Sequence, residues 1–132
     1  MLIDTNIFVE VLLAQRNAER CARFLEKVHK GEIRAHVSTF TIDGVLLNIE
    51  RNRKTVKDLA RFLYHLLSYR TLMVYTPTLR DRLNAFAHMD AFKLDFDDAL
   101  ILQCALSNNI KEIVSFDKHF DKVKMIKRIE PS

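Results

Sequence analysis

Three aspartates in this sequence stand where their carboxylates could bind one metal ion. Asp4 and Asp117 each follow a short apolar segment, and Asp98 lies near the start of a strongly apolar segment at residues 96–107. Two carboxylates about 4 Å apart repel each other by about 4 kcal/mol at an effective dielectric constant of about 20. A divalent cation would remove that repulsion, and a set of oxygen ligands without Cys or His favours Mg²⁺ or Mn²⁺ over Zn²⁺.

An ion bound in this way would support hydrolysis of a phosphate ester, because it can activate a water molecule and neutralise charge that develops on a phosphoryl oxygen. Each aspartate also has a simpler explanation. Asp4 can cap a helix, Asp98 can interact with the dipole of its helix for about 0.3–1 kcal/mol, and Asp117 fits a turn. Three independent roles, however, give no reason for these residues to share one edge of a sheet.

The rest of the sequence predicts strands that alternate with helices. Hydrophobic patterning predicts strands at 2–3, 35–38, 71–75, 112–115 and 125–129, and helices at 7–13, 18–30, 40–49, 55–69, 79–89 and 96–107. Such alternation favours parallel βαβ units and an α/β fold, a three-layer α/β/α sandwich with a central parallel sheet. Ligands of these sheets bind at the carboxyl ends of the strands, which is where Asp4 and Asp117 are expected.

Length and composition indicate one ordinary globular domain covering residues 1–132. Two glycines and two prolines are too few for an all-β fold with many tight turns. Cys21 and Cys104 lie in helical patterns and are expected to be buried thiols in a reducing compartment. The sequence shows no secretory signal and no apolar run of the roughly 20 residues needed to cross a bilayer, so we expect a cytoplasmic protein without a membrane partner.

Basic residues are in moderate excess. The formal net charge of +4 is compatible with a polyanionic partner but does not identify one. Two basic runs, residues 51–54 and 122–128, could neutralise phosphates, although solvated surface charge is the better explanation for most of these residues. Lys118 and His119 immediately follow Asp117 and are therefore the stronger candidates for contacts with a substrate.

Three segments resemble the sequence motifs of PIN domains. Residues 2–6 (Leu-Ile-Asp-Thr-Asn) are similar to the opening motif, in which Asp, Thr or Ser, and Asn follow hydrophobic residues. Residues 95–101 resemble the third acidic motif, where Asp precedes Ala at the start of a helix, and residues 114–120 resemble the closing motif, Thr-x-Asp followed by a basic residue and Phe. The resemblance covers nearly the whole chain, and it points to the VapC-like ribonucleases of prokaryotic toxin–antitoxin pairs.

This resemblance implies a metal site built by Asp4, Asp98 and Asp117, with Asn6 in support and Mg²⁺ or Mn²⁺ as the cofactor. It implies an endoribonuclease that hydrolyses phosphodiester bonds in RNA, which we expect to be single-stranded. It also implies a homodimer and, for a toxin, inhibition by a small antitoxin protein whose tail enters the site.

One position departs from the family pattern. PIN domains usually carry a Glu in the helix after the second strand, within a Ser/Thr-x-x-Glu pattern, and alignment on Thr41 places Gly44 at that Glu. Asp43 lies one residue earlier, which rotates its side chain around the helix by about 100°. Asp43 is therefore a candidate catalytic residue that either reaches the site through a local adjustment or only decorates the helix. Glu50 is farther along the same helix.

Other acidic residues have different expected roles. Asp95 precedes Asp98 by three residues and would share its helical face, as a supporting carboxylate or as a ligand of a second ion. Asp97 should point elsewhere and be solvated, and Glu10 is expected on the outer face of the first helix.

Two other functions are left open by the sequence. With Gly44 in place of the usual Glu, the chain could be a catalytically degenerate PIN domain that acts as an RNA-binding or protein-interaction module. A metal-dependent phosphatase of similar α/β build is a further alternative, which turnover of small phosphate esters would indicate.

Overall fold

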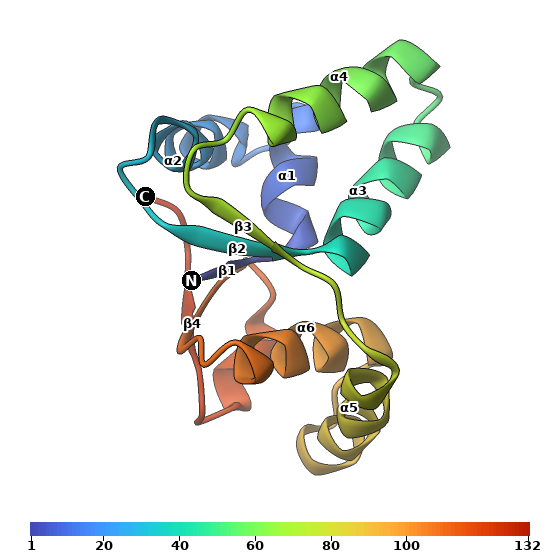
Figure 1. Cartoon of the computed structure of the whole chain (residues 1–132), viewed down its shortest axis with the longest axis vertical. Helices are drawn as coiled ribbons and strands as arrows, with labels where there is room; N and C mark the ends of the chain where they lie inside the picture. The colour runs from blue at the N-terminus through green and yellow to red at the C-terminus, as the bar shows by residue number, and fades with distance from the viewer.

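Five parallel strands form the centre of the molecule. A computed structural model describes all 132 residues (Figure 1). The strands are β1 (Leu2–Ile3), β2 (Ala35–Ser38), β3 (Leu72–Tyr75), β4 (Glu112–Val114) and β5 (Lys127–Ile129). They pair in the order β3-β2-β1-β4-β5, and every neighbouring pair is parallel.

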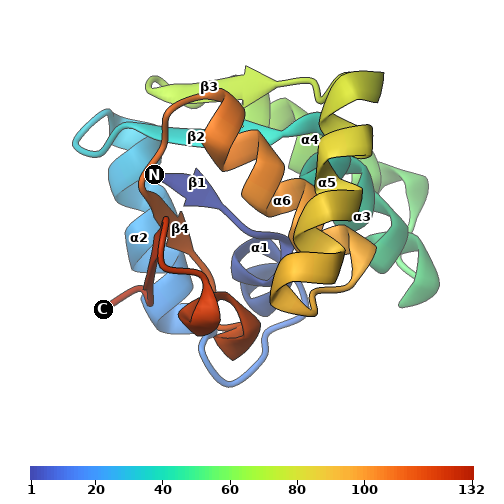
Figure 2. The ribbon, with the colours of Figure 1, turned by 90° about the horizontal axis from the view of Figure 1, so that it is seen from below.

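Helices cover both faces of this sheet. One face carries α1 (Thr5–Leu12), α2 (Ala18–Lys30), α3 (Thr39–Arg51) and α4 (Val56–Leu67), and the other carries α5 (Leu79–Phe92), α6 (Phe96–Ser107) and the short 3₁₀ helix η1 (Lys118–Lys122). Figure 2 views these layers from below, with α5 and α6 on the viewer's side of the sheet. The predicted α/β/α sandwich is confirmed.

Each face of the sheet buries its own hydrophobic core, because successive side chains of a strand point to opposite faces. Leu2 belongs to the core that contains α6, whereas Ile3 belongs to the core that contains α1 and α2. Ile113 and Val114 of β4 divide in the same way. Although β1 is only two residues long, both of its side chains are at most 1% exposed, so this short strand contributes to both cores.

The connections between strands reverse direction at β1 and β4. Helices α1 to α4 carry the chain from β1 through β2 to the edge strand β3, and α5 and α6 then return it to β4, on the opposite side of β1. A crevice forms at the carboxyl ends of the strands where the connections diverge. Asp4 directly follows β1 and Asp117 follows the end of β4, so the fold brings both residues to this crevice.

The element boundaries lie within three residues of the predicted ones. Helix α1 begins at Thr5 rather than Ile7, because the Asp4 side chain accepts a hydrogen bond from the Thr5 backbone N–H and caps the helix earlier. Helix α5 continues to Phe92, beyond its predicted end. Gly31 ends α2 with a φ of 88°, a left-handed conformation that glycine adopts without strain.

Both cysteines are buried free thiols, as predicted. Burial raises the pKa of Cys21 to about 11 and the pKa of Cys104 to about 12. Both thiols are therefore protonated at neutral pH and pack as core residues. No helix in the structure combines the length and the apolar character needed to cross a membrane.

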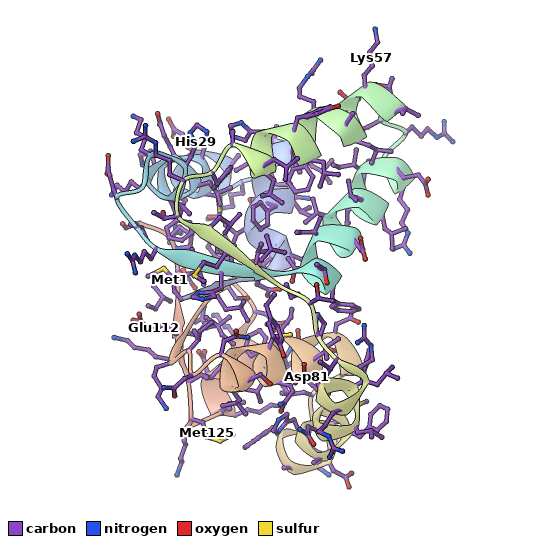
Figure 3. All side chains as sticks on the ribbon, viewed as in Figure 1. Met1, His29, Lys57, Asp81, Glu112 and Met125 are labelled. Atoms are coloured by element: carbon purple, nitrogen blue, oxygen red, sulfur yellow. The ribbon has the colours of Figure 1, made fainter.

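A buried carboxylate joins β3, α5 and α6. Asp81, which Figure 3 labels near the start of α5, is 4% exposed. It accepts hydrogen bonds from Tyr75 Oη at 2.7 Å, Ser107 Oγ at 2.6 Å and the Thr78 backbone N–H at 2.8 Å, and Gln103 Nε2 is a fourth donor at 3.3 Å. Burial alone would raise the pKa of Asp81, but these hydrogen bonds outweigh it and lower the pKa. The ionised side chain therefore holds α5 against α6.

We expect Asp81→Ala to lower the free energy of unfolding by about 2–4 kcal/mol at pH 7, because it leaves several donors without their acceptor. Urea unfolding followed by circular dichroism measures this change. Asp90→Ala, at an exposed position of the same helix, is the control and should change stability by about 0.5 kcal/mol or less.

The same pair of variants tests the pH dependence. Because the folded pKa of Asp81 lies below its ordinary value of 3.8, its stabilisation is present above about pH 4 and is lost as the pH falls further. The difference between wild type and Asp81→Ala should therefore shrink on acidification. A loss for Asp81→Ala no larger than that for Asp90→Ala at pH 7 would contradict the role assigned to Asp81.

Candidate metal centre

Asp4 is held firmly at the end of β1, where it is 5% exposed. Its Oδ1 accepts from the Thr5 backbone N–H at 2.7 Å, and its Oδ2 accepts from Ser115 Oγ at 2.6 Å and Asn6 Nδ2 at 3.0 Å. Burial raises the pKa of Asp4, the hydrogen bonds from Ser115 and Thr5 oppose burial, and the charge of Asp117 raises the pKa further. The carboxylate is thus oriented by its neighbours but costly to ionise.

Ser115 connects this aspartate to the segment after β4. Its Oγ accepts from the Asp117 backbone N–H at 2.9 Å and from Asn6 Nδ2 at 3.1 Å. Asn6 Oδ1 in turn accepts from the Phe116 backbone N–H at 3.3 Å. These contacts tie the end of β4 to the start of α1, which is where a supporting residue for Asp4 would have to act.

Asp98 comes from the opposite layer, in the first turn of α6, and is 7% exposed. Its backbone N–H donates to Asp95 Oδ1 at 3.0 Å, so Asp95 caps the helix that carries it. Burial, and next the charge of Asp117, raise the pKa of Asp98 to about 8, with further contributions from Asp95 and Asp4. Such a shift is expected where a buried carboxylate lies close to other carboxylates.

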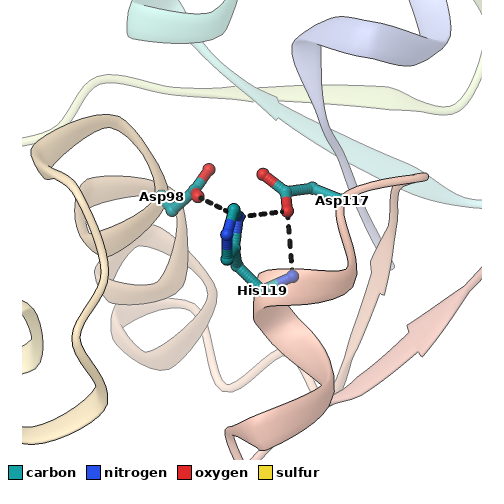
Figure 4. Close-up of side chains that lie close together, drawn as sticks. All are labelled: Asp98, Asp117 and His119. Carbon is teal, nitrogen blue, oxygen red and sulfur yellow. Dashed lines mark hydrogen bonds and ion pairs between the residues drawn. The ribbon is translucent and has the colours of Figure 1, made fainter.

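Asp117 faces Asp98 with the ring of His119 beside both (Figure 4). His119 Nδ1 lies 2.7 Å from Asp117 Oδ1 and 3.8 Å from Asp98 Oδ2. Asp117 Oδ1 also accepts a hydrogen bond from the His119 backbone N–H at 2.9 Å. The imidazole that the sequence offered as a substrate contact therefore lies directly against two of the proposed metal ligands.

One cavity of about 610 Å³ collects these carboxylates. Six aspartates line its wall, namely Asp4, Asp43, Asp95, Asp97, Asp98 and Asp117, together with the polar residues Thr5, Asn6, Asn48 and Arg51. The structure therefore brings the three predicted metal ligands to one place. Their action as ligands stays a prediction.

Comparison with known proteins assigns the family. The family model of the PIN domain matches residues 1–125. This chain belongs to the PIN-domain family. A comparison with curated protein sequences found no match to this PIN domain.

Solved structures of the same fold cover nearly all of this PIN domain. A toxin–antitoxin complex from Klebsiella pneumoniae aligns with a TM-score of 0.74 at 18% identity and covers 99% of this chain and 97% of that chain. VapC20 of Mycobacterium tuberculosis, a toxin that cleaves the sarcin–ricin loop, aligns with a TM-score of 0.75 at 14% identity over 96% of each chain. A DNA-bound VapBC from Salmonella typhimurium aligns with a TM-score of 0.73 at 16% identity. The alignment covers 99% of this chain and 97% of that chain. Identities this low establish the fold alone.

Helix α3 carries Gly44 at the position where PIN domains usually have Glu. Gly44 lines the cavity, and a Cβ added there would meet Thr5 Oγ1 at 3.6 Å and Thr5 Cγ2 at 3.7 Å, which are ordinary contacts. A side chain at this position could therefore begin without a clash, at the wall of the cavity. Asp43 is exposed but also lines the cavity, so the structure places it at the rim without showing that it binds an ion.

The other predicted residues have varied positions. Asp97 is exposed, as predicted, but it lines the cavity instead of pointing elsewhere, because the first turn of α6 opens into it. Lys118 and His119 are both exposed, and neither lines the cavity. Their roles as substrate contacts stay predictions. Glu10 accepts a hydrogen bond from the Asn17 backbone N–H at 2.7 Å and thereby holds the loop between α1 and α2.

Two residues of this region have a position that the sequence pattern did not specify: it gave Ser115 no role and marked Arg51 only as part of the basic run at residues 51–54. Ser115 sits between two aspartates of the site, and its only sequence signal is its place two residues before Asp117 in the closing motif. Arg51, the last residue of α3, lines the cavity as its single basic residue. The basic run at residues 51–54 gave no indication that Arg51 lines the cavity while its basic neighbours do not.

The residues present fit a divalent cation. Carboxylates from three separate segments line the cavity. Ligand atoms of Asp98, Asp117 and His119 all lie within 4.8 Å of one another, and Asp4 is outside this closer group. Burial, and next the charge of Asp117, raise the pKa of Asp98, and a cation bound between the two carboxylates would lower it. A carboxylate-rich set of this kind suits Mg²⁺ or Mn²⁺.

We expect Asp98→Asn to stabilise the metal-free protein at pH 8 by about 1–3 kcal/mol, because it removes a buried charge that neighbouring carboxylates repel. The folded pKa of about 8 exceeds the ordinary 3.8, so wild-type stability should fall as the pH rises between these values, and the variant should lose less. Thermal unfolding in EDTA from pH 5 to 8 measures both effects. Asp97→Asn is the matched control, and a less stable Asp98→Asn protein at pH 8 would contradict the repulsion.

Proposed function

We propose that this PIN domain is a metal-dependent endoribonuclease that hydrolyses phosphodiester bonds in RNA. The observation that carries the proposal is the convergence of Asp4, Asp98 and Asp117 on one cavity, at the place where the strand connections reverse. Membership of the PIN family supports hydrolysis of nucleic acid, and the excess of carboxylates supports a divalent cofactor.

Asp4, Asp98 and Asp117 would hold Mg²⁺ or Mn²⁺. Asp4 can do so while keeping its three hydrogen bonds, since a carboxylate offers about four lone-pair sites. An ion bound there supplies activation of the attacking water and neutralisation of charge on the phosphoryl oxygens. Asn6 would keep the Asp4 carboxylate in one orientation, and Ser115 would do the same from the β4 side.

Rim carboxylates would assist these ligands. Asp43 lines the cavity beside Gly44 and is the remaining candidate for a catalytic carboxylate on α3. Asp95 supports the site through its cap on α6 and through its charge on the cavity wall. Neither side chain needs to contact the ion directly, because a carboxylate at the rim can also order a bound water.

Arg51 is the best-placed residue to contact RNA. It is the one basic residue that lines the cavity, so it would attract a phosphate and orient the RNA strand toward the aspartates. A single strand suits this geometry, because a flexible chain can place one phosphate in a concave site more easily than a duplex can.

A toxin role would require an antitoxin, and a groove between α3 and α4 is suited to bind one. This groove of about 450 Å³ has an apolar lining that includes Leu47, Val56 and Leu63. Asp43 and Leu47 line both the groove and the acidic cavity, so a bound segment could continue from one to the other. The structural neighbours that are toxin–antitoxin complexes support an antitoxin as the partner.

A homodimer is the assembly that we infer. Helix α5 exposes Leu79, Leu83 and Phe86, with exposed fractions of 80%, 63% and 54%. Their spacing places them along one helical face. An apolar face of this kind is costly in water and would be covered by a second copy of the chain.

Gly44 supports one competing function, a non-catalytic module that binds RNA or protein. Without a side chain from α3 at this position, the carboxylates of α6 and the sheet edge would have to hold the ion alone. Wild-type protein that binds RNA but has no measurable affinity for Mn²⁺ would favour this alternative.

We expect purified protein to cleave single-stranded RNA in the presence of Mn²⁺, and both EDTA and Asp4→Asn to reduce the rate by about 100-fold or more. Denatured and refolded protein, free of any co-purified antitoxin, is tested against fluorophore-labelled RNAs of varied sequence. Asp90→Asn is the control that should keep the wild-type rate, and circular dichroism checks folding. Cleavage that persists in EDTA, or no cleavage of any RNA, would count against the proposal.

We expect Gly44→Glu to tighten Mn²⁺ binding by about tenfold, because the cavity has room for the side chain and an additional carboxylate raises the charge of the ligand set. Gly44→Gln is the matched control, with the same size but no charge. Calorimetric titration measures both variants against wild type. Equal affinities for the two variants would mean that this position on α3 does not contact the ion.

A further inference from the structure

The ring of His119 lies between two carboxylates that come from different layers of the fold. His119 Nδ1 is 2.7 Å from Asp117 Oδ1, but it also faces Asp98 Oδ2 at 3.8 Å, which is too long for a hydrogen bond (Figure 4). The ring is 68% exposed, so packing does not impose its orientation. One nitrogen therefore faces two carboxylates from different layers of the fold.

The two distances from His119 Nδ1 are compatible with ligand atoms around a single small cation. Bonds of about 2.1 Å place two ligand atoms about 3 Å apart when they meet at a right angle and about 4 Å apart when they lie opposite each other. The distances of 2.7 and 3.8 Å fall near these two values, and all three ligand atoms lie within 4.8 Å of one another. The three groups therefore need little movement to meet one ion.

The backbone holds His119 in this place. Asp117 caps η1 by accepting the His119 N–H at 2.9 Å, so the ligand and the histidine form one local unit. Phe120, the next residue, is fully buried and anchors the helix in the core. On the α3 side of the cavity, in contrast, Gly44 offers no ligand atom.

We propose that His119 Nδ1 is a ligand of the ion held by Asp98 and Asp117. This inference rests on the proposed metal site. As a ligand, Nδ1 is unprotonated and the ring proton resides on Nε2. A nitrogen donor suits first-row transition ions better than Mg²⁺, which prefers oxygen, so His119 biases the site toward transition ions.

Pulsed electron paramagnetic resonance of the Mn²⁺-loaded protein tests this contact directly. We expect the nuclear modulation of a coordinated imidazole ¹⁴N in wild type and in His65→Ala, an exposed histidine on α4. The modulation should vanish in His119→Ala and in His119→Asn. The asparagine can still donate to Asp117, so it separates metal ligation from positioning of the carboxylate.

Calorimetry provides the second readout. His119→Asn should weaken Co²⁺ binding by about tenfold while changing Mg²⁺ binding less than about twofold. Bound Mn²⁺ without ¹⁴N modulation in wild type would overturn the role of His119 and leave the proposed nuclease intact. Absence of any Mn²⁺ binding would overturn both the ligand assignment and the proposed metal site.

Discussion

The mutual repulsion of buried carboxylates is the constraint on which this structure depends. Asp4, Asp98 and Asp117 reach one cavity from the end of β1, the start of α6 and the segment after β4. Since no single element carries all three, the tertiary fold must hold them together against their charge. Burial and the charge of Asp117 together raise the pKa of Asp98, and a divalent cation is the partner that would lower it.

The fold meets this constraint by fixing each segment separately. Parallel pairing of β1 with β4 sets two of the aspartates side by side, and Ser115 bridges them with hydrogen bonds. Helix α6 is held from behind by Asp81, whose carboxylate binds side chains from that helix. The third wall is less acidic, because α3 brings Gly44 and Arg51 to the cavity. The carboxylates at the sheet edge are therefore held by hydrogen bonds, whereas the α3 side of the cavity carries less negative charge.

The parts of this arrangement that depend on local pattern were predictable from the sequence. The alternation of strands and helices gave the sandwich, and motif spacing gave Asp4, Asp98 and Asp117. The strand order and the facing side chains depend on long-range packing, which one sequence does not reveal. For the same reason, the sequence could not decide where Asp43 points, and the position of Arg51 was hidden in a basic run. The exposure of Asp97 was predicted correctly, but its place on the cavity wall was not.

Anomalous diffraction from a crystal soaked in Mn²⁺ tests the shared ion most directly. We predict one strong peak in the acidic cavity, about 2.0–2.3 Å from carboxylate oxygens of Asp98 and Asp117 and on the side of the cavity that faces Asp4. A cavity without a peak, while Mn²⁺ occupies other parts of the same crystal, would contradict it.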